Sequence, residues 1–360
     1  QAILFQVVGS WWAWDERSKS IDFGSKAMAL ALNASCVELG ERRSGLGAAV
    51  VDSTVFLAGG HSGETPLKLF ESFEPGEELE DRGKWRRLDP MLARRTYCSS
   101  IALDGMVYVI GGSADGRALN SFEVFDALHS CEWARWFTKP PMQIKRTLHA
   151  TAVCSGRVFV VGGFDGLRDL NLMEEYDPKT NSWRWGSAME WPRSYFALCA
   201  CAGSMYAIGG QNRGSEVGPR AHRHVERFDV YSENWFEVAP LLQGRVGCAA
   251  ANLICDDDLE YIFVCGGSNG DIALSSMERY DPRQNVWTEA PPMSEKRLGH
   301  TVAVVRNRLY AIGGFDGKEA LGTFECFDPK LNRWGPVLDM GASHTPPAED
   351  GTSSSATGTT

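Results

Sequence analysis

Short apolar segments alternate with polar turns along most of the chain, and they follow one recurring order. A run of small or alternating apolar residues, as in 146–156, is followed by a strongly β-prone run that ends in Gly-Gly, as in 157–163. A polar loop then leads to a segment with an aromatic residue and Asp, as in 173–177. A short turn leads to a last segment that carries Trp. The pattern predicts four short β-strands per unit.

This unit occurs six times with nearly fixed internal offsets. The spacings between successive Gly-Gly pairs are 52, 51, 47, 57 and 47 residues, which indicates a minimal unit of about 47 residues with insertions in its loops. The first glycines of the pairs are Gly59, Gly111, Gly162, Gly209, Gly266 and Gly313. The tryptophans of the last segment are Trp85, Trp136, Trp183, Trp235, Trp287 and Trp334.

An arginine begins each unit, and the full order is Arg, aromatic-x-x-Gly-Gly, aromatic-Asp, Trp. This order resembles the kelch repeat, most closely in 160–183 and 311–334. The resemblance implies an all-β fold, a kelch β-propeller with six full four-stranded blades over residues 42–339. A four-stranded sheet cannot bury both faces alone, and radial stacking gives each sheet two neighbours. We expect the tryptophans and paired aromatic residues to fill the gaps between blades.

Both ends of the chain depart from the repeat. Residues 1–41 resemble a degenerate kelch-like unit without the Trp, so we expect six blades plus an incomplete seventh blade or accessory layer, and seven blades remain open. Kelch propellers typically close the ring with one blade that combines strands from both termini. Residues 340–360 are rich in Ser, Thr, Gly and Pro and are expected to be a disordered tail. Because the chain begins at Gln1, we expect a fragment or processed product.

Composition narrows the possible functions. The net charge of −10 disfavours nucleic acid as a partner, and no run of 18 apolar residues predicts a membrane span. The ten cysteines are scattered without a C-x-x-C pair, which favours reduced thiols and a cytoplasmic location. Motifs for phosphate-binding loops, zinc hydrolases and serine hydrolases are absent, so we expect no metal, no cofactor and no enzyme activity. Some kelch propellers are oxidases or sugar-processing enzymes, but the axial domain of such an oxidase is missing.

The arginine column is the main candidate for binding chemistry. By resemblance, each arginine begins the innermost strand near the loop-bearing face of the ring. Six guanidinium groups there would form a cationic mouth suited to an acidic partner motif. The other interpretation is that they cap blade turns or pair with Asp126, Asp177 and their equivalents. The column consists of Arg43, Arg95, Arg146, Arg193, Arg245 and Arg297.

Further candidates surround the same mouth. Tyr97 and Tyr195 follow their arginines by two residues and are expected to be aromatic anchors or to be buried between blades. The loops after Gly-Gly are expected to flank the mouth, although their Asp-Gly and Asn-Gly pairs are also ordinary turn residues. The loop candidates are Phe164, Asp165, Asn212, Asn269 and Phe315, with His61, Ser113, Gln211 and Asp316 beside them.

The histidines give weaker signals. His222 and His224 lie in a basic insertion of the fourth unit, but no Cys or carboxylate stands at ligand spacing for a metal. His149 and His300 occupy matching positions three residues after their arginines. They are expected to be packed strand histidines, with a place on the channel wall as the alternative.

Taken with the resemblance, these features predict a non-catalytic protein–protein interaction module. The kelch-like proteins that it resembles imply the substrate-recognition domain of a cullin-type ubiquitin ligase adaptor. The partner would be a protein with an acidic or polar motif, and the dimerising and cullin-binding parts would precede Gln1. The alternative is a cytoskeletal, actin-associated or scaffold kelch protein.

Overall fold

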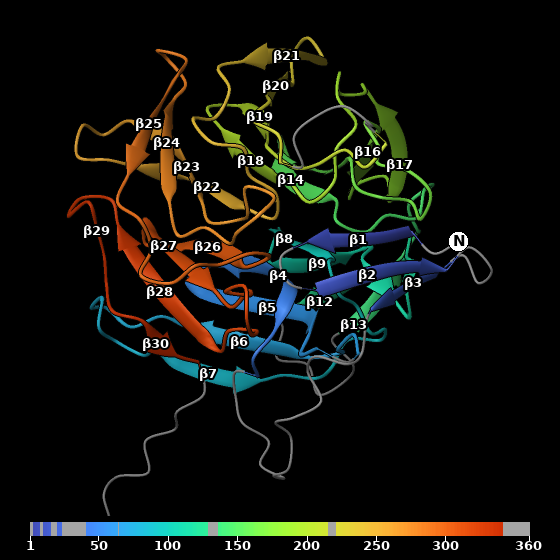
Figure 1. Cartoon of the computed structure of the whole chain (residues 1–360), viewed down its shortest axis with the longest axis horizontal. Coiled ribbons are helices and arrows are strands. Elements are labelled where there is room, and N and C mark those ends of the chain that lie inside the picture. Colours follow the sequence, from blue (N-terminus) through green and yellow to red (C-terminus); the bar gives the residue numbers. More distant parts are fainter. Residues whose placement is uncertain are drawn as a thin grey trace, which may run out of the picture.

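The computed structural model describes residues 3–7, 10–15, 20–23, 41–63, 65–128, 136–214 and 221–340, the first three segments as strands only. Six antiparallel sheets, each built from one continuous piece of chain, are arranged around a central axis (Figure 1). We number these blades one to six in chain order. The third blade, with strand order β14-β15-β16-β17, is typical. The predicted six four-stranded blades are therefore confirmed.

Each blade runs from an innermost to an outermost strand. The innermost strands are β4 (Ser44–Val51), β8 (Ser99–Leu103), β14 (Ala150–Cys154), β18 (Ala197–Cys201), β22 (Ala249–Ile254) and β26 (Thr301–Val305). The second strands are β5 (Thr54–His61), β9 (Met106–Ile110), β15 (Arg157–Val161), β19 (Ser204–Ile208), β23 (Glu260–Cys265) and β27 (Arg308–Ile312). The third strands are β6 (Phe70–Glu74), β12 (Phe122–Asp126), β16 (Met173–Asp177), β20 (Val225–Asp229), β24 (Met277–Asp281) and β28 (Thr323–Asp328). The outermost strands are β7 (Lys84–Arg87), β13 (Trp136–Lys139), β17 (Ser182–Gly186), β21 (Asn234–Val238), β25 (Val286–Ala290) and β29 (Arg333–Trp334).

Two short additions complete the described strands of the ring. The loop of the second blade holds a hairpin of β10 (Ser113–Ala114) and β11 (Arg117–Ala118). In the sixth blade, β30 (Leu338–Asp339) pairs with β28 beyond β29.

The ring closes without a seventh blade. The innermost strands contact one another in sequence, and β26 contacts β4, which completes the circle. We call the contact between the sixth and first blades the closing junction. The N-terminal strands β1 (Ile3–Val7), β2 (Ser10–Asp15) and β3 (Ser20–Phe23) form a separate three-stranded sheet. The possible seventh blade is thus not part of the ring, because no gap remains between β26 and β4. The predicted tail after Met340 lies outside the described residues.

The hydrophobic core is divided among the junctions between blades. Each of the six buried clusters joins two neighbouring blades, including the first and the sixth. Between the second and third blades, Tyr176 and Trp183 lie with their ring centroids 5.1 Å apart, and Phe122 contacts both. Burying one such ring contributes roughly 2–3 kcal/mol. The described residues include no helix, hence none able to cross a membrane.

Neighbouring blades approach one another closely at the Gly-Gly pairs. Gly59 has a φ of +65°, and a Cβ added there would lie 2.4 Å from the carbonyl oxygen of Arg95 in the next blade. The N–H of Gly60 donates to that same oxygen at 2.8 Å. Glycine is required at this position because a side chain would push the two blades apart.

Candidate protein-interaction face

One face of the ring carries two sets of loops. Since each innermost strand begins where its second strand ends, the loops after Gly-Gly and the loops leading into each arginine meet at the same face. Backbone hydrogen bonds join them: the N–H of Arg95 donates to Leu67 O, and that of Leu67 donates to Gly60 O. We call this surface the loop-bearing face.

The six arginines of the repeat are buried beneath this face. Their exposed fractions are 0–1%. In the third blade, the Arg146 guanidinium lies 2.9 Å from Glu174 and donates to the carbonyl oxygens of Gly162 and Leu172. The arginine of each blade thus joins the start of the innermost strand to the second and third strands.

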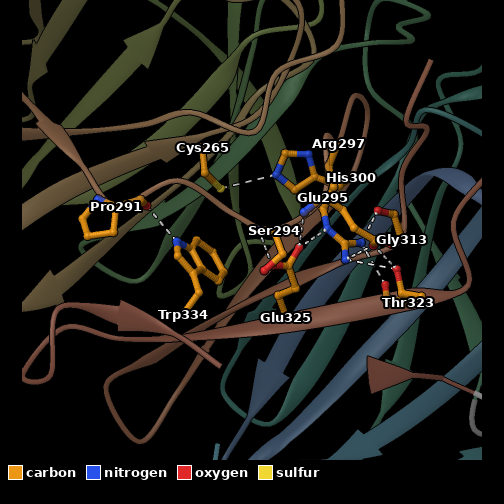
Figure 2. A network of polar contacts seen from close by, with 10 residues as sticks. All are labelled: Cys265, Pro291, Ser294, Glu295, Arg297, His300, Gly313, Thr323, Glu325 and Trp334. Atoms are coloured by element: carbon orange, nitrogen blue, oxygen red, sulfur yellow. Dashed lines mark hydrogen bonds and ion pairs between the residues drawn. The ribbon is translucent and has the colours of Figure 1, made fainter. Parts of the chain in front are cut away.

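A column of glutamates receives these arginines, and our sequence analysis missed it. Each glutamate precedes the aromatic residue of the third strand by two positions, so the signal Glu-x-aromatic was present in all six units. In the sixth blade, Glu325 also accepts the backbone N–H groups of Ser294 and Glu295 (Figure 2). The pairs are Arg43–Glu71, Arg95–Glu123, Arg146–Glu174, Arg193–Glu226, Arg245–Glu278 and Arg297–Glu325.

These pairs correct the expected cationic mouth. A guanidinium group that is fully buried and bonded to a carboxylate and to carbonyl oxygens is not accessible to a partner outside the ring. Arg43, Arg95, Arg146, Arg193, Arg245 and Arg297 therefore do not form it. The alternative role in the blade turns is the observed one, although Glu rather than Asp is the partner.

A ring of backbone hydrogen bonds surrounds the axis at the same face. The residue two positions after each arginine donates its N–H to the corresponding carbonyl oxygen of the preceding blade, at 2.7–3.2 Å. All six residues have a positive φ of 51–66°. In chain order they are Gly45, Tyr97, Leu148, Tyr195, Gly247 and Gly299. The ring ties all six blades together around one narrow opening.

Two tyrosine side chains fill this opening. The rings of Tyr97 and Tyr195 meet edge to face at 5.6 Å, and Tyr195 occupies the space left by the missing side chains of Gly247 and Gly299. The Tyr97 hydroxyl lies 3.3 Å from His61 Nε2, and burial raises the pKa of Tyr97 to about 12. Both tyrosines are half-buried beside a central cavity of about 250 Å³. The structure thus brings together Tyr97, Tyr195 and His61, and their contact with a partner stays a prediction.

The loops after Gly-Gly are turns closed by hydrogen bonds from their own side chains. Asp165 Oδ1 accepts the N–H groups of Leu167 and Arg168 at 2.7 and 2.8 Å, and Asn269 and Asp316 accept the equivalent pairs. Asn212 accepts one such bond, from Gly214. These four side chains are half-buried and shape the loops. Any direct contact with a partner remains a prediction for them.

The fourth blade extends its loop toward the third. The guanidinium of Arg213 lies 4.4 Å from the ring centre of Phe164, which it covers, and 3.6 Å from the buried carboxylate of Asp169. Phe164 is therefore buried, whereas Phe315 at the equivalent place in the sixth blade is half-buried. Of these two predicted aromatic contacts, Phe315 is the more accessible.

Exposed cations stand beside the buried arginine column instead. Arg94 and Lys145 directly precede buried arginines and are exposed, and Arg117 is exposed on the loop of the second blade. None of the three forms an ion pair with a residue that the structure describes. Large apolar side chains are also exposed on this face, as Leu167 (82%) and Trp191 (44%) illustrate. The face therefore combines unpaired positive charge over the second and third blades with apolar contact area.

The histidines do not form a metal site among the described residues, where no group of three His, Cys, Asp or Glu side chains could hold an ion. His149 and His300 are buried between blades, and burial lowers the pKa of each to about 3. His300 Nε2 lies 3.4 Å from Cys265 Sγ (Figure 2). His222 and His224 lie with ring centroids 5.9 Å apart, and Trp191 stacks on His224.

Comparisons with known proteins agree with this geometry. A family model described as the KLHDC2/KLHL20/DRC7 Kelch-repeats domain matches residues 98–298, and a Kelch motif model matches residues 42–92 and 296–340. The chain is 33% identical to mouse Kelch-like protein 35 over 54% of its length, covering 30% of that protein. It is 26% identical to human Kelch-like protein 38 over 63% of its length, covering 37% of that protein.

The spermatocyte protein spe-26 of Caenorhabditis elegans is 32% identical over 58% of this chain and 35% of its own length. The chain thus spans about a third of the length of these curated relatives. The solved structure of YjhT superposes with a TM-score of 0.67 at 17% identity, covering 85% of this chain and 100% of that one. At this identity the likeness concerns the fold.

Proposed function

Because the chain belongs to the kelch-repeat family, we propose that it is a non-catalytic module that captures a protein partner on its loop-bearing face. The observation that carries this proposal is that Arg94, Arg117 and Lys145 are exposed, form no ion pair within the described ranges, and share this face with the exposed Leu167. Exposed charge next to apolar area is typical of surfaces that bind proteins.

The chemistry of the face favours an acidic partner motif with apolar residues. The whole chain carries a net charge of −10, so a local excess of positive charge is a departure from the rest of the surface. Guanidinium groups bind carboxylates through two parallel hydrogen bonds, and a local positive potential raises the rate of association with an acidic segment. The partner would rest on the platform that Tyr97 and Tyr195 form over the axis.

The similarity to kelch-like proteins supports a more specific role, the substrate-recognition domain of a cullin-type ubiquitin ligase adaptor. The parts that bind the cullin would lie outside these 360 residues. We further propose a cytoplasmic location. The eight cysteines that the structure describes are all free thiols, in keeping with a reducing compartment.

The test is affinity capture with a charge-reversed face. The variant Arg94→Glu/Arg117→Glu/Lys145→Glu is compared with wild type, and captured proteins are identified by mass spectrometry. We expect the variant to capture at least tenfold less of each partner than the wild type does, since each reversed contact costs about 1–3 kcal/mol. Circular dichroism verifies that the variant is folded.

The matched control reverses three exposed cations elsewhere on the blades, Lys84, Lys179 and Arg333, and so changes the net charge equally. Capture should survive in this control. Equal loss in both variants would mean that overall charge rather than the loop-bearing face is responsible. Unchanged capture by the folded face variant would refute the proposed binding surface. Co-capture of a cullin with the full-length protein tests the ligase role separately.

A further inference from the structure

A second candidate site lies on the opposite face of the ring, at the closing junction. A cleft of about 400 Å³ is present there, within the range of small-molecule sites. Its lining comes from the turns of the sixth blade and from the loop after β6 in the first blade. The lining residues are Glu77, Arg306, Asn307, Arg308, Asp328 and Lys330.

Arg306 and Arg308 each use only part of their guanidinium N–H groups in hydrogen bonds to the protein. Arg308 Nε donates to Asp328 Oδ2 at 3.1 Å, and Arg308 Nη1 donates to the backbone carbonyl of Glu77. Arg306 Nη1 lies 3.4 Å from the carbonyl oxygen of Gly76. The remaining N–H groups of both arginines have no partner among the described residues, so they are available to a ligand in the cleft.

The nearby carboxylate of Asp328 does not oppose an anion strongly. It is 8% exposed, and besides Arg308 it accepts the backbone N–H groups of Lys330 and Leu331 at 2.9 and 3.2 Å. Its charge is therefore already compensated. The exposed side chain of Glu77 is the remaining negative group in the lining. The lining therefore carries three cations and two carboxylates, one of them paired with Arg308, which leaves a formal charge of +1 in the cleft.

The turn that carries Arg306 is unusual within this molecule. Arg306 and Asn307 both have a positive φ, 50° and 59°, whereas the matching turns of the second, third and fourth blades have glycine at the second place. A left-handed conformation at a non-glycine residue costs about 1 kcal/mol and is often retained for a functional reason. The Asn307 amide also bonds both the N–H and the C=O of Ile254, which fixes the turn to the fifth blade.

We propose that this cleft is an oxyanion site that binds a phosphate group, either free phosphate or the phosphorylated side chain of a partner. Two preoriented guanidinium groups and one ammonium group provide the forked donors and the charge that a phosphate dianion requires. The cleft spans the sixth and first blades. A bound phosphate therefore stabilises the closing junction, because a ligand that binds only the folded ring shifts the folding equilibrium.

The experiment titrates the whole chain in phosphate-free buffer by isothermal titration calorimetry. The probes are inorganic phosphate, a short phosphoserine peptide and its unphosphorylated twin. We expect saturable binding of the phosphorylated probes, weakened at least about tenfold in Arg306→Ala/Lys330→Ala. Glu77→Gln should tighten binding about two- to threefold, because it removes the opposing charge. The melting temperature should rise with phosphate in wild type and in Glu77→Gln, and much less in the double variant.

Controls separate a site from general charge effects. Lys179→Ala changes the lysine that matches Lys330 in the third blade and should leave binding unchanged. The double variant should fold, since Ala202 already occupies the place of Arg306 in the fourth blade with a φ of 48°. Binding of phosphate without the peptide identifies free phosphate as the ligand, and the reverse identifies a phosphorylated side chain. Absence of saturable binding in wild type, equal binding by the double variant, or equal binding of the unphosphorylated twin would overturn the proposal.

Discussion

The closing junction and the five junctions between consecutive blades solve the same packing problem with different means. All six share the backbone bond from the second glycine of one blade to the arginine of the next, including Gly314 N to Arg43 O at 3.1 Å. All six also contain a buried aromatic cluster. The common part of the repeat therefore closes the ring without a shared strand.

The difference lies at the outer strands. At the other junctions the indole N–H of the repeat tryptophan donates to a carbonyl oxygen of the preceding blade, as Trp136 does to Asp89 and Trp334 to Pro291. At the closing junction the Trp85 Nε1 is buried and has no hydrogen-bond partner in the part of the chain that the structure describes. Side chains still cross this junction: Arg308 donates to the carbonyl oxygen of Glu77, and Arg42 pairs with Glu319 at 2.9 Å on the loop-bearing face.

The physical reason is chain connectivity. Consecutive blades are joined by a short loop, so their junctions form between segments that are already close. The first and sixth blades meet only after the whole ring is built, and this costs additional loop-closure entropy. We therefore expect the closing junction to open first when the protein is destabilised.

The largest expected effect comes from emptying the core of the closing junction. Phe324 is fully buried, and its ring centroid lies 5.0 Å from that of Phe73 in the first blade. Phe324→Ala should lower the free energy of unfolding by about 3–5 kcal/mol, through lost burial and a residual cavity. Urea denaturation measures the loss. Hydrogen exchange should show β4 and β26 opening before the rest of the ring.

The matched control is Phe122→Ala at the same position of the second blade, where Phe122 contacts Tyr176 in the third blade at 4.9 Å. A similar loss of stability is expected, but without early exchange in β4 and β26. Identical exchange patterns in the two variants would contradict a special weakness of the closing junction.

Acid should weaken two junctions between consecutive blades more than it weakens the closing junction. Burial lowers the pKa of His149 and His300 to about 3 from the ordinary value of 6.5, so below pH 6.5 the unfolded chain binds protons that the folded ring does not. Their stabilising contribution is present above pH 6.5 and is lost as the pH falls toward 3. At pH 5.5 the two together should cost about 2–3 kcal/mol. Leu46 occupies the matching position at the closing junction.

The measurement is urea denaturation at several pH values for wild type and His149→Phe/His300→Phe. Phe196 occupies the matching position in the fourth blade, so phenylalanine is accepted there. Burial also lowers the pKa of His61 and His222, hence the difference between the two proteins is the relevant quantity. An equal slope in both between pH 6.5 and 5 would show that the two histidines do not control the acid response.

The repeat columns explain why the fold could be predicted from the sequence. Gly-Gly, the third-strand aromatic residue and Trp each have one structural role that recurs at every junction, so their spacing was enough to place four strands per blade. The spacing of the repeat residues could not show that the ring excludes residues 1–41. Spacing describes a single blade, whereas closure of the ring depends on the widths and angles of all six blades together.

The binding face was less predictable. The spacing of the repeat placed the arginines at the loop-bearing face. Their burial depends on the glutamates that pair with them. A single glutamate such as Glu71 or Glu325 does not show from the sequence that it pairs with a buried arginine. The position directly before the repeat arginine holds a cation in four units, as Arg42, Arg94, Lys145 and Lys296, but its spacing does not show which of them form ion pairs, as Arg42 does with Glu319. Exposure is a property of the assembled loops, and a one-dimensional pattern does not encode it.

The smallest expected effect comes from removing the indole N–H of Trp85, which lacks the hydrogen bond that the other repeat tryptophans form. Trp85 stacks on Phe73 at 4.4 Å, and phenylalanine can keep that apolar contact while removing the unpartnered N–H. Trp85→Phe should therefore change the free energy of unfolding by about 0.5 kcal/mol or less, because the lost indole area offsets the relief of a buried donor. Trp136→Phe should cost about 1–2 kcal/mol, since it also leaves the Asp89 carbonyl without its donor at 3.0 Å. Urea denaturation of the two variants side by side gives the comparison. Equal losses would mean that Trp85 finds a partner in solution and that the closing junction is as well bonded as the others.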